Sequence, residues 1–398
     1  MPWLAWLGNG YDVLSRARAI MKSRKRRLRI GFTTGTAAAA AAKAAVLFIG
    51  GRQGIREVDT PLPDNTRMRI PISLLKAQKD GASALVIKDG GDDPDATHRA
   101  HIWCRVRIGP SGPKGNVTIT GGEGVGRVTK PGLPVEVGQY AINPAPKQQI
   151  TRAVREGLVE AGIEGSVTVT VEVPGGEEIA QKTLNPRLGI VGGISILGTR
   201  GTVVAFSTEA YKDTITLAMN VARAQGLGTI VLTTGGRSER FLRGLRPDIP
   251  PVAFVQVADF FSFSVQEAVR KGFSHIIYSC FFGKLVKMAL GHGYTHARSS
   301  VLDLKRLSQW AREEGIQDEA AGKVASSNTA REALGVILGQ ECADRVLARV
   351  LKEALARARE FAGPGPRLTY FLFSTDGKLL AHKTDPQSTI GYGAKKRR

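Results

Sequence analysis

The sequence is poor in cysteine and has no long apolar run. Its three cysteines, Cys104, Cys280 and Cys342, stand far apart and form no C-x-x-C pair. This spacing excludes a disulfide framework and a cysteine zinc site, and it fits the reducing cytosol. Residues 37–49 are apolar but include Lys43, and a membrane span needs roughly 20 residues. We therefore expect a soluble, cytoplasmic protein with no membrane partner.

Aromatic residues are also scarce, at 6% of the chain, whereas glycine is abundant, with 47 residues. Many glycines indicate many tight loops, which suit an α/β or α+β enzyme better than a helical bundle. The hydrophobic fraction of 42% allows a substantial core and excludes a globally disordered chain. A length of 398 residues predicts two domains, or one large domain with an insertion.

Acidic residues are outnumbered, because 56 Lys and Arg face 35 Asp and Glu, a net charge of +21. Eight basic residues lie within residues 1–29 and four within 395–398. Terminal basic runs are usually solvated extensions, and a nucleic-acid tether is the alternative. No helix-turn-helix, zinc-finger or RNP-like motif accompanies them, so we expect no nucleic-acid partner. The positive charge left in the body would attract a polycarboxylate substrate.

The first half of the chain has an α+β pattern. An alanine-rich helix is expected over residues 37–48, with a threonine cap before it and Gly50 as its stop. A second helical stripe covers residues 147–161. Alternating apolar segments separated by Gly, Pro and Asp predict strands at 68–73, 84–88, 101–108, 117–120 and 166–173.

The second half has the pattern of a parallel sheet. A helix over residues 208–224 precedes apolar runs at 229–233, 252–257 and 275–279, each followed by a helical stretch. Such alternation of buried strands with helices is typical of parallel α/β folds. We also expect a buried strand at 188–197, helices over 303–361, and a terminal hairpin that turns at Asp376 and Gly377.

Three loops follow the predicted parallel strands, at residues 233–237, 258–260 and 280–284. Ligands of such sheets bind at the carboxyl ends of the strands. A glycine-rich loop exposes backbone N–H groups, and an acid after a neighbouring strand often holds ribose hydroxyls. Loops that simply turn the chain are the alternative.

The remaining motifs give weaker indications of function. Gly193 to Arg200 has P-loop spacing but lacks the Lys-Ser/Thr ending, which excludes an NTPase. His292 and His296 lack the glutamate of a zincin, and neighbouring glycines disfavour a helix that would present both rings. The acidic turn at 92–98 could bind a cation, act as acid or base, or simply be a polar loop, which is commonest.

Six segments together resemble the CbiD family, the cobalt-precorrin-5B C1-methyltransferases of anaerobic cobalamin biosynthesis. They occur in family order from about Leu28 to the terminal hairpin. The segments are GFTTGTAAAAAAK at 31–43, KDGGDDPDATH at 88–98, GGEGVGRVTKPG at 121–132, NPRLGIVGGISILG at 185–198, GKLVK at 283–287 and TH at 295–296.

The resemblance implies methylation of C-1 of cobalt-precorrin-5B by S-adenosylmethionine, giving cobalt-precorrin-6A. No protein-bound metal is expected, because the substrate carries the cobalt. Neighbouring enzymes of the pathway are expected as transient partners. The implied architecture has an α+β domain at 28–186, a partly Rossmann-like α/β domain at 187–362 and a hairpin at 363–384, between basic ends at 1–27 and 385–398.

The same resemblance, together with the loops, suggests site residues. The adenosyl donor is assigned to Gly192, Gly193, Gly198, Thr233, Thr234, Gly235, Gly236 and Asp259. The tetrapyrrole is assigned to Thr33, Thr34, Thr36, Asp92, Asp93, His98, Glu123, Arg127 and Lys284, across an interdomain cleft. His296 is the candidate for a polar or acid/base role, and a hydrogen-bonded structural histidine is its alternative.

The chain departs from the family pattern at Ala37, Ser262 and Phe282. These departures leave open a relative that binds the tetrapyrrole without transferring a methyl group. The glycine-rich loops are also compatible with a dinucleotide oxidoreductase, and the net positive charge is also compatible with a basic nucleic-acid-binding protein. Met1 and Met21 are both possible starts.

Overall fold

The computed structural model describes residues 28–109 and 116–385 and divides the chain into two compact units, Met1–Tyr211 and Lys212–Arg398. The division falls within helix α6 (Thr208–Ala224). The sequence predicted a boundary after Pro186. The segment that follows Pro186 instead pairs with the first unit, because Val191 and Ile190 lie opposite Arg127 and Val128 in a short antiparallel ladder.

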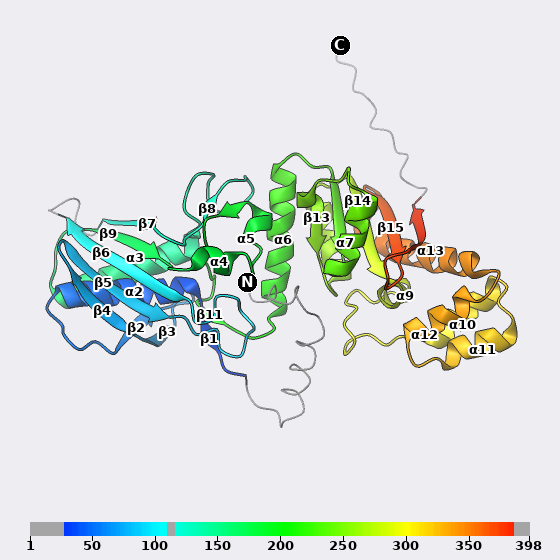
Figure 1. The fold of residues 1–398 in the computed structure, drawn as a ribbon, viewed down its shortest axis with the longest axis horizontal. Coiled ribbons are helices and arrows are strands. Elements are labelled where there is room, and N and C mark those ends of the chain that lie inside the picture. The colour runs from blue at the N-terminus through cyan, green and yellow to red at the C-terminus, as the bar shows by residue number, and fades with distance from the viewer. Residues whose placement is uncertain (1–27, 110–115, 386–398) are drawn as a thin grey trace, which may run out of the picture. The chain divides into compact units, whose positions relative to one another are not determined.

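Unit 1 is built on a five-stranded sheet that two helices cover (Figure 1). Neighbouring strands are antiparallel except β9 and β7, which run parallel. In spatial order the strands are β4 (Leu74–Gln78), β5 (Gly81–Ile87), β6 (His101–Gly109), β9 (Ser166–Glu172) and β7 (Val117–Gly121). The α+β pattern predicted for the first half is therefore present.

Helix α2 (Thr34–Ile49) lies at the centre of unit 1, packed against helix α3 (Pro144–Ala161) and the sheet. All its alanines are fully buried, and their small side chains allow close approach to neighbouring elements. Its N-cap is Thr33, whose hydroxyl accepts a hydrogen bond from the N–H of Thr36 at 3.2 Å. The predicted stop at Gly50 is confirmed, whereas the threonines expected before the helix, Thr34 and Thr36, lie within it because the helix begins three residues earlier than predicted.

Short elements connect this core. They are the strand pairs β1 (Gly31–Phe32) with β11 (Thr202–Val203), β2 (Glu57–Pro61) with β3 (Arg67–Pro71), and β8 (Arg127–Val128) with β10 (Ile190–Val191), and the helices α4 (Gly176–Ala180) and α5 (Asn185–Leu188). The predicted strand at 188–197 is wrong except for β10. Gly189 and Gly192 adopt positive φ angles of 74° and 76°, which an extended strand does not accommodate.

Unit 2 contains the predicted parallel sheet. The strands are ordered β13 (Phe254–Gln256), β12 (Thr229–Thr233), β14 (His275–Phe281), β15 (Arg367–Phe373) and β16 (Leu379–Thr384). The first four run parallel, and β16 closes the predicted terminal hairpin as an antiparallel edge. The run predicted at 252–257 begins with a 3-10 turn, Pro251–Ala253, because proline lacks the N–H that a ladder requires.

Helices cover both faces of this sheet. Helix α7 (Gly236–Leu245) buries Leu242 with Val231 and Ile277 on one face. On the other face lie helices α8 (Phe261–Arg270), α9 (Phe282–Ala289) and α13 (Ala343–Ala362). Phe261 of α8 contacts both Tyr278 of β14 and Phe361 of α13. Tyr278 itself stacks on Tyr370 of β15 with 5.2 Å between ring centroids.

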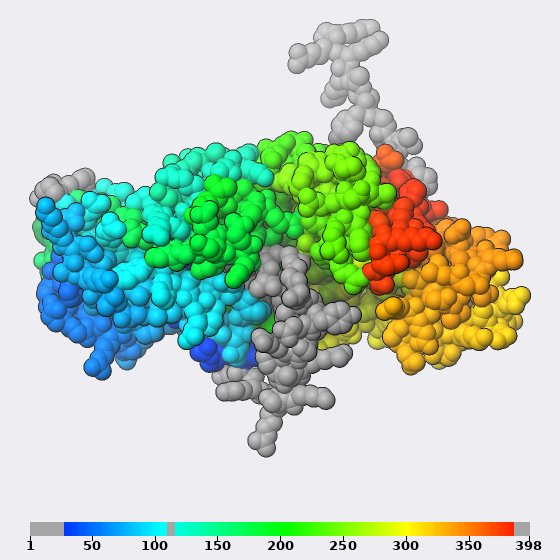
Figure 2. Space-filling model, viewed as in Figure 1, coloured from blue at the N-terminus to red at the C-terminus, as the bar shows by residue number. Residues whose placement is uncertain are grey.

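A helical group completes unit 2 and accounts for the helices predicted after residue 303. It comprises α10 (Leu304–Glu313), α11 (Asp318–Ser326) and α12 (Ala330–Leu338). In Figure 2 these helices and α13, in yellow and orange, lie beside the terminal hairpin in red. Within the described ranges, no helix combines the length and the apolar character that crossing a membrane requires.

Candidate functional site

The carboxyl ends of β12, β13 and β14 lie at one edge of the unit 2 sheet. The strands are parallel and in register, with Thr233 opposite Gln256 and Ser279. Helices α7, α8 and α9 each begin within a few residues of a strand end. Backbone N–H groups at the start of a helix have no intrahelical partner, although in α8 those of Phe261 and Ser262 donate to the carbonyls of Asp259 and Gly293. The three loops singled out in the sequence are therefore brought together.

The glycine-rich loop after β12 is anchored on both sides. The N–H of Thr234 donates to the carbonyl of Ser279 at 3.2 Å, and the buried hydroxyl of Thr233 donates to the carbonyl of Val255 at 3.4 Å. A Cβ atom added at Gly235 would meet no heavy atom within 4 Å. The backbone at Gly235 consequently faces open space, as a loop that receives a ligand requires.

Asp259, after β13, is held in a fixed position. Ala258 before it has a positive φ of 47°, a left-handed conformation that costs a non-glycine residue about 1–2 kcal/mol. The fully buried Thr295 donates its hydroxyl to Oδ1 of Asp259 at 2.9 Å and its N–H to the Asp259 carbonyl at 3.0 Å. Strain of this kind at a strand end is typical of functional sites.

Lys284 in α9 forms an ion pair with the same Oδ1 atom of Asp259. One turn further along α9, the ammonium of Lys287 donates to the carbonyl of Thr295 at 3.2 Å. Burial and the neighbouring charge of Lys287 lower the pKa of Lys284 to about 8, while the Asp259 carboxylate favours its charged form. Two cations thus surround Thr295 at the edge where the loops meet.

An aromatic row borders these cations. Phe260 contacts Tyr294 with 5.0 Å between ring centroids, and Tyr294 stacks on the ring of His296 at 5.8 Å. Burial lowers the pKa of His296, and the charges of Lys284, Arg298 and Lys287 lower it further. A lowered pKa keeps the imidazole neutral at neutral pH. The Nδ1 atom of His296 accepts a hydrogen bond from the N–H of Arg298 at 3.3 Å, as expected for a hydrogen-bonded structural histidine, so the polar role of His296 stays a prediction.

The three departures from the family pattern are packed residues. Ala37 is fully buried in α2, and Phe282 is buried at the start of α9. Ser262 donates its hydroxyl to the carbonyl of Gly293 at 3.1 Å. None of these side chains has an interaction with Asp259, Lys284 or His296 among the described contacts.

The loops assigned to the tetrapyrrole lie in unit 1, where many of their polar side chains hydrogen-bond neighbouring backbone groups. Thr33, Thr34 and Thr36 are buried. The hydroxyl of Thr34 hydrogen-bonds the backbone of Leu197, and that of Thr36 donates to the carbonyl of Gly201 at 2.7 Å. A Cβ at Gly198 would come within 2.5 Å of the Thr33 side chain. The threonine motif and residues 195–201 therefore form one packed assembly.

The segment 121–127 packs on the same assembly. A Cβ at Gly193 would come within 2.0 Å of the carbonyl oxygen of Gly124, so both positions require glycine for close backbone approach. Glu123 and Arg127 are exposed, and the Arg127 guanidinium lies 4.0 Å from the ring centroid of Tyr140. Gly192, Gly193 and Gly198, predicted in the same domain as Thr233 and Asp259, lie instead in unit 1.

The acidic turn at 92–98 is tied to the start of the described chain. Asp92 accepts a hydrogen bond from the N–H of Arg29 at 2.7 Å, and His98 accepts one from the N–H of Gly90 at 3.0 Å. Lys88 and Asp95 form a buried ion pair. The polar groups of these residues are therefore largely hydrogen-bonded or ion-paired with one another.

Asp93 is the exception in this turn. It is 6% exposed, and its Oδ2 accepts a hydrogen bond from the N–H of Phe206 at 3.2 Å, while Oδ1 has no partner among the described residues. Burial, and next the nearby carboxylate of Asp95, raise the pKa of Asp93 to about 6. Among the described residues, no group of three or more His, Cys, Asp or Glu side chains could hold a metal ion.

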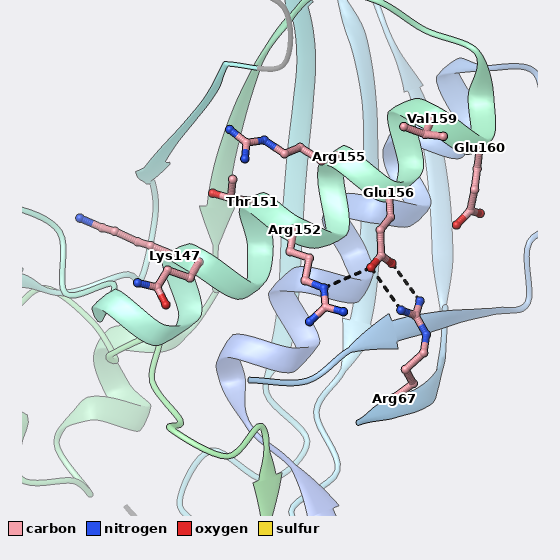
Figure 3. A pocket seen from close by; sticks show the side chains of 9 residues that line it. Arg67, Lys147, Thr151, Arg152, Arg155, Glu156, Val159 and Glu160 are labelled. Atoms are coloured by element: carbon pink, nitrogen blue, oxygen red, sulfur yellow. Dashed lines mark hydrogen bonds and ion pairs between the residues drawn. The ribbon is translucent and has the colours of Figure 1, made fainter. Parts of the chain in front are cut away.

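A basic groove along α3 was not predicted (Figure 3). It encloses about 920 Å³ and is lined by Arg67, Lys147, Arg152 and Arg155 among others. Glu156 joins Arg67 and Arg152 through contacts of 2.8 and 3.3 Å. The helical stripe at 147–161 predicted the helix, but the groove depends on Arg67 from a distant strand.

Comparison with known proteins identifies the family. The CbiD family matches residues 21–205, and the CbiD C-terminal domain matches residues 294–384. A cobalt-precorrin-5B C(1)-methyltransferase of Nitratidesulfovibrio vulgaris is 48% identical over 359 residues, covering 89% of this chain and 92% of the relative. The chain belongs to the CbiD family. The resemblance seen in the six sequence segments is thereby confirmed.

The chain is also similar to other CbiD proteins. An enzyme of the same name from Geobacillus kaustophilus is 43% identical, over 89% of this chain and 95% of its own. The crystal structure of a cobalamin biosynthesis protein, CbiD of Archaeoglobus fulgidus, is similar at 28% identity, with a TM-score of 0.36 over 73% of this chain and 85% of that one.

Proposed function

We propose that this chain is a cobalt-precorrin-5B C1-methyltransferase of cobalamin biosynthesis, with S-adenosylmethionine as donor and cobalt-precorrin-6A as product. The observation that carries this proposal is the identity of up to 48%, over most of the chain, to enzymes of that name. The cobalt would arrive with the substrate. As an enzyme of a biosynthetic pathway it would act in the cytoplasm, with transient contacts to the enzymes before and after it.

The edge of the unit 2 sheet is the proposed donor site. Its strand order, β13-β12-β14-β15, corresponds to the 2-1-3-4 order of doubly wound folds, whose ligands bind beside the first strand. Two observations fit an adenosyl group. The backbone at Gly235 is open, and Asp259 Oδ2 accepts no hydrogen bond within the described part of the chain. Thr233, Thr234, Gly235 and Gly236 would border the adenosyl group, and Asp259 would accept from ribose hydroxyls.

The chain's own residues would then mainly bind and orient. The bound donor supplies a methyl group on a sulfonium, whose transfer needs little acid/base catalysis. Good alignment in a dry cleft can remove roughly 7–11 kcal/mol of the barrier. In unit 1, Arg127 is proposed to hold a substrate carboxylate, together with the loops that carry Thr33, Asp93 and Glu123. In unit 2, Lys284 is proposed to hold a ligand carboxylate. His296, whose pKa is lowered and whose ring stacks on Tyr294, would orient the acceptor ring through a hydrogen bond.

The decisive experiment is an incubation of the purified protein with cobalt-precorrin-5B and methyl-labelled S-adenosylmethionine. We expect one labelled methyl group on the corrinoid, detected by mass spectrometry and placed at C-1 by NMR. A corrinoid that binds but gains no methyl group would indicate a binding protein without transfer activity. A methyl group at another carbon would refute the assignment to C-1.

A further inference from the structure

An ion pair crosses the proposed donor site. Strand β12 lies between β13 and β14 in the sheet. Asp259 follows β13, whereas Lys284 lies in the helix that follows β14, and the two side chains meet. Their contact therefore joins the loops on either side of the glycine-rich loop of β12. The groups that would face a ligand at this edge are, in this structure, paired with each other.

Asp259 has a second anchor that does not depend on Lys284. Thr295 holds it through two hydrogen bonds, of 2.9 and 3.0 Å, and is itself fully buried. Lys284 has weaker alternatives, since its ammonium lies 3.4 and 3.5 Å from the hydroxyl and carbonyl oxygens of Thr295. If the ion pair opened, Asp259 would stay in place and the flexible lysine side chain would move.

An opened pair requires a new anion for Lys284. Its side chain is 30% exposed and that of Asp259 is 18% exposed, so both charges are largely shielded from water. A buried charge left without a partner is strongly destabilising. A ligand that brings a carboxylate to Lys284 and hydroxyl groups to Asp259 would satisfy both residues at once. An adenosyl amino acid carries both groups, whereas the tetrapyrrole offers only the carboxylates.

We propose that Lys284 is a carboxylate-exchange residue: on ligand binding it leaves Asp259 for a ligand carboxylate, and Asp259, still held by Thr295, accepts from the ligand's hydroxyls. This inference rests on the proposed function. It makes the Lys284–Asp259 pair a part of the binding site that discriminates ligands with a carboxylate from those without one. Lys284 is thus a specificity-determining residue.

The test compares two adenosyl compounds by calorimetry. S-adenosylhomocysteine carries an amino-acid carboxylate and 5′-methylthioadenosine lacks it. We expect the wild-type protein to bind S-adenosylhomocysteine more tightly, and Lys284→Gln to reduce that advantage by about tenfold, the worth of a charge-assisted hydrogen bond. Lys284→Arg keeps the charge and should keep most of the advantage. Asp259→Asn should weaken methylthioadenosine more than S-adenosylhomocysteine, because Lys284 is then free for the carboxylate.

Controls separate exchange from a merely structural pair. Lys323→Gln removes a lysine of the same unit that pairs with Glu319 at 2.7 Å on an exposed helix face, and it should leave both affinities unchanged. A structural pair would make Lys284→Gln and Asp259→Asn weaken both compounds equally, which would overturn the exchange. Thermal melts of each variant show whether the fold is retained.

The carboxylate could also come from the tetrapyrrole, and the assay distinguishes this source. In that case Lys284→Gln would leave the preference between the adenosyl compounds intact and raise the KM for cobalt-precorrin-5B about tenfold. An unchanged preference with an unchanged KM would refute the exchange altogether. If the wild-type protein bound neither adenosyl compound and transferred no methyl group, the proposed function itself would fail, and this inference with it.

Discussion

At the scale of the residue, Asp93 is a carboxylate whose buried environment disfavours its charge. It is buried with one carboxylate oxygen unpaired, and its pKa is raised from the ordinary 3.8 to about 6. Between these values the folded protein keeps a proton that the unfolded chain has lost, so stability falls as pH rises through this window. Above this pH window the full free-energy cost of the buried carboxylate charge remains. Such a cost is tolerated most often where a residue has a role other than stability.

Replacing Asp93 should therefore stabilise the protein at neutral pH. Asp93→Asn keeps the acceptor for the Phe206 N–H, and we expect it to raise the free energy of unfolding at pH 7.5 by about 1–3 kcal/mol, with little effect near pH 4. Urea unfolding at both pH values measures this. Asp80→Asn, which removes an exposed partner of Arg107, should change stability by less than about 1 kcal/mol. A destabilised Asp93→Asn protein at pH 7.5 would contradict the argument.

Sequence motifs pointed to Asp93, Asp259, Lys284 and His296, but not to what surrounds them. The hydrogen bond from Phe206 to Asp93 spans 113 positions, and the one from Thr295 to Asp259 spans 36. Which carboxylate is buried and which is paired depends on such contacts between distant residues. A local pattern carries no information on them, so it predicted chemistry-bearing residues without their protonation or partners.

At the scale of the element, the start of β14 should make unit 2 sensitive to acid. His275 hydrogen-bonds the hydroxyl of Thr369 in β15 at 2.9 Å. Burial, and then the charges of Arg367 and Arg246, lower the pKa of His275 to about 4. Between pH 4 and pH 6.5, the ordinary pKa of histidine, His275 is protonated in the unfolded chain but stays neutral in the folded protein. Stability is therefore complete above pH 6.5 and falls as pH drops through this window.

We expect this residue to account for about 1–2 kcal/mol of lost stability between pH 7 and pH 4.5, after allowance for its partial exposure. His275→Gln cannot take up the proton and should flatten the pH dependence by that amount. Chemical unfolding of both proteins across the range provides the comparison. Equal slopes for wild type and His275→Gln would show that other groups govern the acid response.

Elements with continuous apolar patterns were predicted well. β12 and α6 match their predicted limits, 229–233 and 208–224, to the residue. A strand buried on both faces gives a continuous apolar run, and a helix buried on one face gives an apolar stripe, so both are recognisable in the sequence. The segment 188–197 is equally apolar but forms only the two-residue β10. Its isoleucines are buried against unit 1 while Gly189 and Gly192 turn the chain. Composition alone does not separate a buried strand from a buried loop.

At the scale of the whole molecule, the two units divide the predicted site residues between them. Gly193 and Gly198 pack in unit 1 against Gly124 and Thr33, whereas a Cβ atom added at Gly192 would meet no heavy atom within 4 Å. Thr233 to Gly236, Asp259, Lys284 and His296 lie in unit 2. The predicted boundary after Pro186 assigned all the donor glycines to one domain. Backbone pairing of Ile190 with Val128 and of Ile194 with Val125 places this segment in unit 1. The proline at 186 carries no information on such long-range pairing.

This division makes a prediction about the donor alone. Gly193 and Gly198 are already packed against Gly124 and Thr33 and leave no room for a ligand, whereas Gly235 faces open space. S-adenosylhomocysteine should therefore slow hydrogen exchange at the amides of residues 234–237, 258–261 and 282–287, and leave those of residues 193–198 unchanged. Hydrogen-exchange mass spectrometry with and without the ligand reads both regions in one experiment, and the sheet amides of β6 serve as an internal reference. Equal protection of residues 193–198 would return Gly193 and Gly198 to the donor site.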